Sequence, residues 1–248
     1  MCWSMSVSVL MAAGGAAATG LAIRRREPAA IPLTLGYFTV MEVLQSAGYL
    51  VIDQCGSSLN QSITLLSYLH IVFQPFFINA FAMELVPRGV QARVRWPVHV
   101  ACGLSAAVML LQLYPFAWAG SCRPGEVLCG TPLCLVSGDW HLAWNIPYND
   151  LLGPIEQALG SHFAFPTYLI AVFIVPFIYG AWRFVLLHLL AGPILAWQLT
   201  SNPNEWPTVW CLFSIGILLM GTSPWLRGHF SIERWRLWPR AWLAEAAS

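Results

Sequence analysis

The stretch FAFPTYLIAVFIVPFIYGAWRFVLLHLLAGPILAWQLT, from Phe163 to Thr200, decides the topology of this chain. A transmembrane helix needs about 20 mostly apolar residues. The stretch is therefore either one long tilted helix or two short helices joined by a turn at Tyr179 to Arg183. The two readings place every later residue on opposite sides of a membrane, and the arginines elsewhere in the chain distinguish them.

The composition around this stretch is that of a membrane protein. Of the 248 residues, 58% are hydrophobic and 9% are charged, whereas a soluble domain carries about 25% charged residues. Seven segments are apolar enough to cross a bilayer, namely Trp3 to Ile23, Ile31 to Ile52, Ile63 to Leu85, Val98 to Phe116, Phe163 to Tyr179, Phe184 to Thr200 and Thr208 to Leu226. We expect an all-α fold, a polytopic membrane bundle of seven transmembrane helices that forms one domain over residues 1–248.

The distribution of arginine sets the orientation of this bundle, because short arginine-rich loops stay in the cytoplasm. With two crossings between Phe163 and Thr200, eleven of the twelve arginines fall on one side, and Arg123 is the exception. A single crossing would move the four C-terminal arginines outside. The sequence therefore predicts an external amino terminus and a cytoplasmic carboxyl terminus in the plasma (inner) membrane. It also predicts an external loop over 117–162 and a cytoplasmic amphipathic tail over 227–248.

Charge and residue usage exclude several classes of protein. The net charge of +1 offers no basic footprint for nucleic acid. Every basic residue is arginine, so neither retinal nor pyridoxal phosphate (PLP) can form a lysine Schiff base. The partners that we expect are the lipid bilayer and either a second membrane protein or another copy of the chain.

Polar side chains inside the spans are the first candidates for a site, because they are costly in hydrocarbon and usually functional. Glu42, Gln45 and Tyr49 are spaced to share one face of a helix. His70 and Gln74 share a face of the next span, and Pro75 then frees a backbone carbonyl. The predicted ligand-binding residues are Glu42, Gln45, Tyr49, His70, Gln74, His141 and Glu205.

Side chains able to bind a metal gather in the outer half of the predicted bundle. His70, Glu205 and Cys211 form the candidate metal site, and a transition metal is the cofactor that their donor atoms suit. A zinc site of Cys129, Cys134 and His141 is the alternative, although a fourth ligand is missing.

The loop cysteines are candidates for disulfides, because an oxidising exterior favours such bonds. The disulfide candidates are Cys122, Cys129 and Cys134. We predict at least one bridge in this loop, involving Cys129 or Cys134, and leave the pairing open.

Five segments carry a resemblance to known sequences. They are Met1-Cys2-Trp3-Ser4, Met41-Glu42-Val-Leu-Gln45, the block from His70 to Glu84, Gly138-Asp-Trp-His141 and Asn204-Glu-Trp-Pro-Thr-Val-Trp-Cys211. Together they resemble an uncharacterised group of bacterial seven-helix integral membrane proteins that open with Met-Cys-aromatic-Ser. The resemblance implies the fold and supplies candidate residues, and it implies no activity.

Three functional hypotheses follow from these residues. The leading one is an outward-facing polar cavity that binds a metal ion or a small ligand, with or without catalysis, under a lid formed by Trp140 to Asn149. The second is a small proton- or ion-coupled transporter with a path through Glu42, His70 and Glu84. The third is a non-catalytic membrane assembly or sensor subunit.

Overall fold

The computed structural model describes residues 4–160, 165–211, 213–239 and 242, and these are mostly helical. Met1, Cys2 and Trp3, which open the first of the resembling segments, lie outside the described residues. The first four long helices are α1 (Met5–Arg24), α2 (Ala30–Tyr49), α3 (Ser58–Met83) and α4 (Arg88–Gln112). They agree in order and approximate position with the first four predicted segments.

The second half of the chain forms three more helical rods, each built from shorter pieces. The fifth rod is α6 (Pro166–Leu169), the π-helix η1 (Ile170–Ile174) and α7 (Val175–Ile178). The sixth is α8 (Trp182–Leu189), the π-helix η2 (Leu190–Ile194) and α9 (Leu195–Leu199). The seventh is α10 (Trp206–Trp210) with α11 (Phe213–Thr222), followed by α12 (Pro224–Phe230) across the end of the bundle.

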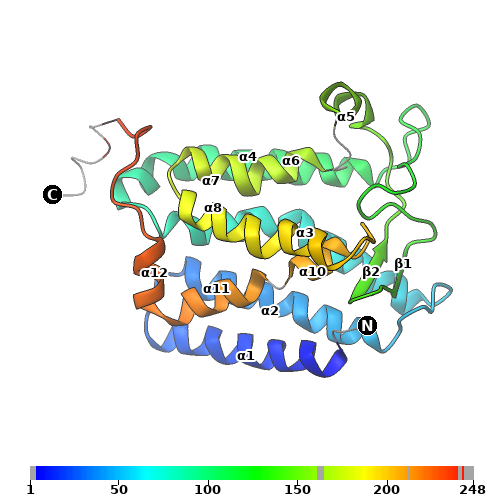
Figure 1. The fold of residues 1–248 in the computed structure, drawn as a ribbon, viewed down its shortest axis with the longest axis horizontal. Helices are drawn as coiled ribbons and strands as arrows, with labels where there is room; N and C mark the ends of the chain where they lie inside the picture. Colours follow the sequence, from blue (N-terminus) through cyan, green and yellow to red (C-terminus); the bar gives the residue numbers. More distant parts are fainter. Residues whose placement is uncertain (1–3, 161–164, 212, 240–241, 243–248) are drawn as a thin grey trace.

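Successive rods run antiparallel, so their connections gather at two ends of the bundle (Figure 1). We call the end formed by 50–57, 113–160 and 200–205 the loop end. It carries the hairpin β1 (Cys134–Ser137) and β2 (Leu142–Asn145) and the short helix α5 (Gly153–Leu159). The opposite end, formed by 25–29, 84–87, 179–181 and 223–239, is the arginine end.

The long apolar stretch that decides the topology forms two rods. They are joined by a turn at Gly180, within the segment where the sequence predicts a turn. Gly180 has a φ of 101°, which a residue with a side chain rarely adopts. The Trp238 indole packs against this glycine and donates a hydrogen bond of 2.9 Å to the Tyr179 carbonyl. Trp238 is therefore buried against the bundle, whereas the sequence predicts an amphipathic tail over 227–248.

Four of the described helices are long and apolar enough to cross a membrane: α1, α3, α4 and the rod Trp182–Leu199. The seventh rod together with α12 would make a fifth, bent span. Helix α2 is not among them, since Glu42, Gln45 and other polar residues lower its hydropathy, and the rod Pro166–Ile178 is shorter. The described residues thus include apolar helices of the kind found in membrane proteins. They give four candidate spans, or five with the bent one, whereas the sequence predicts seven.

Candidate functional site

The polar face predicted on α2 is present, and it meets a histidine from the loop end. The His141 ring is hydrogen-bonded on both nitrogens, at 2.9 Å to the Tyr49 hydroxyl and at 3.0 Å to the Gln45 carboxamide oxygen. Because the ring is buried, its pKa is lowered to about 3, so His141 is neutral at pH 7. A neutral imidazole suits this place, with one ring nitrogen donating and the other accepting.

The same face continues inward to the break between α10 and α11. Gln45 lies near the Cys211 thiol, and one Glu42 carboxyl oxygen lies 3.4 Å from the Ser214 hydroxyl. The other Glu42 oxygen and the Gln45 amide nitrogen are buried and have no hydrogen-bond partner within the described ranges. We call this set the polar column; it consists of Glu42, Gln45, Tyr49, His141, Cys211 and Ser214.

Glu205 holds the loop over the polar column. Its carboxylate accepts hydrogen bonds from the backbone N–H groups of Asp139, Trp140 and His141 and from the Thr200 hydroxyl at 2.7 Å. A side chain at Gly138 would collide with this carboxylate, which explains the glycine. Glu205 is therefore a structural anchor of the turn, and the prediction that it binds a ligand has no support in this geometry.

His70 lies outside the polar column. Its Nε2 is 2.7 Å from the Tyr37 carbonyl oxygen, and the Tyr37 hydroxyl donates to the His70 carbonyl at 2.5 Å. The two rings stack at 3.9 Å, beside an open groove lined by Phe73 and Phe77. Residues five apart on a helix point to different sides, so Tyr37 holds His70 away from Glu42. His70 links α2 to α3 here and is not part of the predicted site.

The candidate metal site is not assembled. Among the described residues, no group of three or more His, Cys, Asp or Glu side chains is placed to hold a metal ion. His70, Glu205 and Cys211 are each engaged elsewhere, and the Cys211 thiol donates to the Pro207 carbonyl at 3.3 Å. The alternative zinc site is also wrong in this structure, because Cys129 and Cys134 are both used in disulfides.

Two disulfides tie the loop end together. Cys122 is bonded to Cys129 and Cys55 to Cys134, in agreement with the expectation of at least one bridge in the loop. The pairing with Cys55 could not be foreseen, because Cys55 comes from a different connection, 79 residues away.

A cavity of about 360 Å³ lies beside the polar column, between α3, α4, α6, α9 and α10. Its wall is mainly apolar and aromatic, and it includes Phe165, Trp197, Trp206 and Trp210. Sequence reasoning missed these residues. Their signal was the aromatic cluster from Trp206 to Trp210, which stands where the chain re-enters the bundle.

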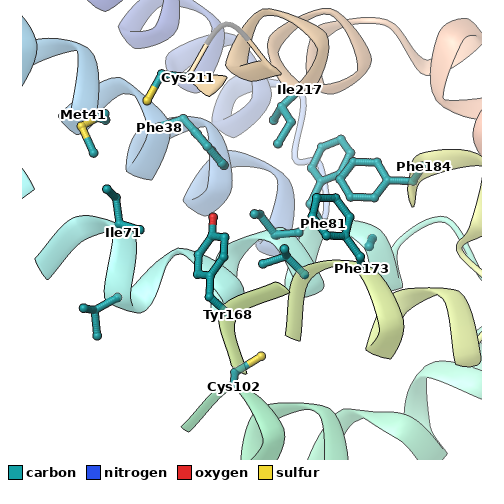
Figure 2. Packing of buried hydrophobic residues seen from close by; sticks show 14 of the residues in the cluster. Phe38, Met41, Ile71, Phe81, Cys102, Tyr168, Phe173, Phe184, Cys211 and Ile217 are labelled. Atoms are coloured by element: carbon teal, nitrogen blue, oxygen red, sulfur yellow. The ribbon is translucent and has the colours of Figure 1, made fainter. Parts of the chain in front are cut away.

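The polar groups of this cavity come from α3 and α6. The Tyr168 hydroxyl donates a hydrogen bond of 2.8 Å to the Gln74 carboxamide oxygen, and Figure 2 shows that hydroxyl pointing from α6 into the bundle interior. The bond to Tyr168 is the one side-chain hydrogen bond of Gln74 in the described part of the chain, and it leaves the amide N–H groups without a protein partner in the cavity wall. Because Pro75 has no N–H, the Ile71 carbonyl also lacks its usual helical donor, and Ile71 lines the cavity.

The polar column does not continue towards the arginine end. Beside Glu42 there is a space of only about 10 Å³, enclosed by Leu35, Phe38 and Ile217, which is about the room of one water molecule. Glu84 lies at the far end of α3, where burial raises the pKa of its carboxyl. The residues that the structure describes therefore do not form the continuous polar path that the transporter hypothesis requires.

The fold and these sites define the protein as a mostly helical bundle with apolar helices and a disulfide-tied loop end. Comparison of the sequence places it further: the chain belongs to a family of unknown function, DUF5765, whose model matches residues 6–231. This agrees with the resemblance to an uncharacterised group. No curated protein and no solved structure matches the chain, so the geometry must carry the functional argument.

Proposed function

We propose that this protein crosses the plasma (inner) membrane seven times, with the loop end outside, and binds a small lipid-soluble ligand in the cavity beside the polar column. Large apolar side chains are exposed on the outsides of the rods, as a lipid surface requires; Leu10, Leu33 and Leu104 are each more than half exposed. Ten arginines lie at or near the arginine end: Arg24, Arg25, Arg26, Arg88, Arg93, Arg95, Arg183, Arg227, Arg234 and Arg236.

The orientation is tested by topology reporters. Fusions placed in the turn at Arg25 and after Ser248 should both report a cytoplasmic position, because the arginine excess keeps this end inside. A fusion in the loop between Gly120 and Gly125 should report the opposite side. A periplasmic signal at either of the first two positions would overturn the orientation.

The single observation that carries the ligand proposal is the unpaired Gln74 amide in an aromatic cavity. Pockets of roughly 300–1,000 Å³ with apolar walls and a few polar groups are typical ligand sites, and this one is near the lower limit of that range. An apolar molecule with one oxygen acceptor would fill the wall and satisfy the Gln74 donor. The polar column is a poorer site, because most of its side chains already bond to one another.

Two buried glutamines provide matched variants for the test. In Gln74→Leu the cavity loses its donor while its shape is nearly kept, so affinity should fall about tenfold, the loss expected for one hydrogen bond. In Gln45→Leu the same change falls in the polar column and should reduce stability while leaving the ligand bound. Mass spectrometry of organic extracts from the purified proteins measures the ligand content.

The outcomes of this comparison separate the hypotheses. A small molecule present in wild type and Gln45→Leu but depleted in Gln74→Leu supports the cavity. Equal depletion in both variants, or an extract from wild type that contains only bulk lipid, would remove the ligand proposal. The assembly or sensor subunit would then be the better reading.

A further inference from the structure

A groove on the outside of the bundle lies between α1 and α2, apart from the ligand cavity. The two helices run side by side at one edge of the bundle (Figure 1). The groove has a volume of about 530 Å³ and is lined by Thr19 and Ile23 of α1 and by Leu33, Gly36 and Val40 of α2. Ile23, Leu33 and Val40 are each more than half exposed, so the described part of the chain leaves this groove, here called the α1–α2 groove, uncovered.

The length of the α1–α2 groove matches the hydrocarbon of one leaflet. The groove begins at Ala29, beside the arginine end, and extends along α2 to Val40. These eleven residues of helix correspond to a length of about 16 Å. The hydrocarbon core of a bilayer is about 30 Å thick, so one leaflet supplies about half of that. A single acyl chain of the leaflet at the arginine end would therefore fill the groove along its length.

The end of the groove at Ala29 is positively charged. Arg24, Arg25 and Arg26 are all exposed, and they lie between Ile23 and Ala29, which both line the groove. Within the described ranges, the side chains of Arg24 and Arg26 make no hydrogen bond and no ion pair. Two positive charges therefore stand at this end of the groove without a partner from the protein.

The neighbouring residues do not neutralise these charges. Glu27 is paired with Arg227 at 2.6 Å, and the Arg25 guanidinium donates to the Thr222 carbonyl at 2.7 Å. Arg26 has a φ of 54° at the end of α1, in a position that glycine usually occupies. No contact of its side chain with the described residues accounts for an arginine at this position, which points to a partner outside the chain.

We propose that the α1–α2 groove binds an anionic phospholipid, with one acyl chain between the helices and the phosphate group at Arg24 and Arg26. Guanidinium groups form strong, charge-assisted hydrogen bonds to phosphate oxygens, and basic residues at the cytoplasmic ends of membrane helices attract anionic lipids. A zwitterionic headgroup would bring its own cation beside these arginines, so an anionic headgroup is favoured. The lipid site rests on the membrane insertion proposed above and does not depend on the ligand cavity.

Native mass spectrometry of the purified full-length protein in a neutral detergent measures this binding. Dioleoyl phosphatidylglycerol should bind at a concentration at least about tenfold lower than dioleoyl phosphatidylcholine, because the acyl chains are identical and each arginine contributes about fivefold in affinity. Equal binding of the two lipids would overturn the proposal. A detergent micelle has no two sides, so a reversed orientation found with the topology reporters would leave this result unchanged.

A pair of double variants tests the role of the two arginines. Arg24→Gln combined with Arg26→Gln should weaken the binding of dioleoyl phosphatidylglycerol at least about tenfold. The control combines Arg234→Gln with Arg236→Gln, which removes the same charge from the segment that Trp235 ties to the Ile178 carbonyl. This control should bind the lipid like wild type. An equal loss in both double variants would mean that total charge attracts the lipid, and the proposal would be wrong.

Gly36→Leu tests the groove itself. A Cβ atom at Gly36 would lie 3.6 Å from the Thr19 methyl group, which is an ordinary contact, so the rest of the leucine would occupy the groove and displace the acyl chain. In the control Gly20→Leu the same side chain enters α1 where no atom lies within 4 Å. Gly36→Leu should lose the bound dioleoyl phosphatidylglycerol and Gly20→Leu should keep it, whereas retention by both folded variants would exclude the groove. Thermal unfolding in detergent shows whether each variant is folded; if Gly36→Leu is not, the comparison of the arginine variants decides.

Discussion

The polar column and the neighbouring cavity each contain a buried glutamine with a spare donor, but the surroundings of the two donors differ. In the column, the Gln45 oxygen bonds to His141, and the Gln45 amide nitrogen is buried without a hydrogen-bond partner among the described residues. In the cavity wall, the Gln74 oxygen accepts from Tyr168, and the Gln74 amide makes no hydrogen bond to another described residue. Gln74 lines the cavity and Gln45 does not, so only the Gln74 donor is within reach of a ligand there.

This difference shows that a buried polar residue marks a site only when its spare hydrogen-bonding capacity faces a space that a ligand can fill. Buried polar groups are normally satisfied, and a satisfied cluster fixes the packing of helices. An unsatisfied donor facing an apolar space is rarer and points to a missing partner. The predictions below concern the anchor of the column, then the column itself, then a packing residue outside it, in order of decreasing effect, and the last one also measures ligand content.

Replacing Glu205 should have the largest effect. Glu205→Ala leaves the N–H groups of Asp139, Trp140 and His141 buried without their common acceptor, at about 1–3 kcal/mol for each group. We expect a loss of roughly 3–5 kcal/mol in unfolding free energy. Chemical or thermal unfolding in detergent measures it.

Glu27→Ala is the matched control at the arginine end, where Glu27 pairs with Arg227 at 2.6 Å. Its effect should be smaller, because Glu27 makes a single ion pair, which contributes less than the several backbone hydrogen bonds that Glu205 accepts. If Glu205→Ala were no more destabilising than Glu27→Ala, Glu205 would not anchor the loop.

The next effect is a pH dependence that belongs to His141. Its pKa is about 3 in the folded protein and about 6.5 in an unfolded chain, so between these values the unfolded state binds the extra proton. Stability should therefore fall by about 1.4 kcal/mol for each pH unit as the pH drops from about 6.5 towards 3.

The variant His141→Gln tests this assignment, because a carboxamide keeps a donor and an acceptor but does not titrate. Its unfolding temperature should change less than that of wild type between pH 7 and pH 4.5. If the unfolding temperatures of the two proteins changed with pH in parallel, the pKa of His141 would not be lowered by folding.

Much of the fold could be predicted from the sequence, because it depends on local patterns. The order of the helices follows from apolar length, and the turn at Gly180 follows from a glycine and an arginine between two apolar runs. The shared face of Glu42, Gln45 and Tyr49 follows from helical spacing alone. Each of these features is set within one segment.

The site was harder to predict, because it depends on how distant segments meet. Nothing in α3 alone shows that the His70 ring bonds to the Tyr37 carbonyl, or that Gln74 accepts a hydrogen bond from Tyr168, which lies 94 residues later in the chain. The acceptor role of Glu205 was also hidden, since its partners are backbone N–H groups that every sequence has. Spacing along the chain can place a residue on one face of a helix, but it cannot show which distant residue contacts that side chain.

The smallest effect is expected at His70, which separates helix packing from ligand binding. His70→Leu removes the hydrogen bond to the Tyr37 carbonyl but keeps an apolar side chain in the groove. Hydrogen bonds between membrane helices contribute only about 0.6 kcal/mol on average, so unfolding should shift by roughly 0.5–1.5 kcal/mol. Because His70 does not line the cavity that contains Gln74, the ligand content measured by mass spectrometry should equal that of wild type. A variant that keeps its stability but loses its ligand would show that His70 reaches the binding site, and the distinction between packing residues and the cavity would then have to be redrawn.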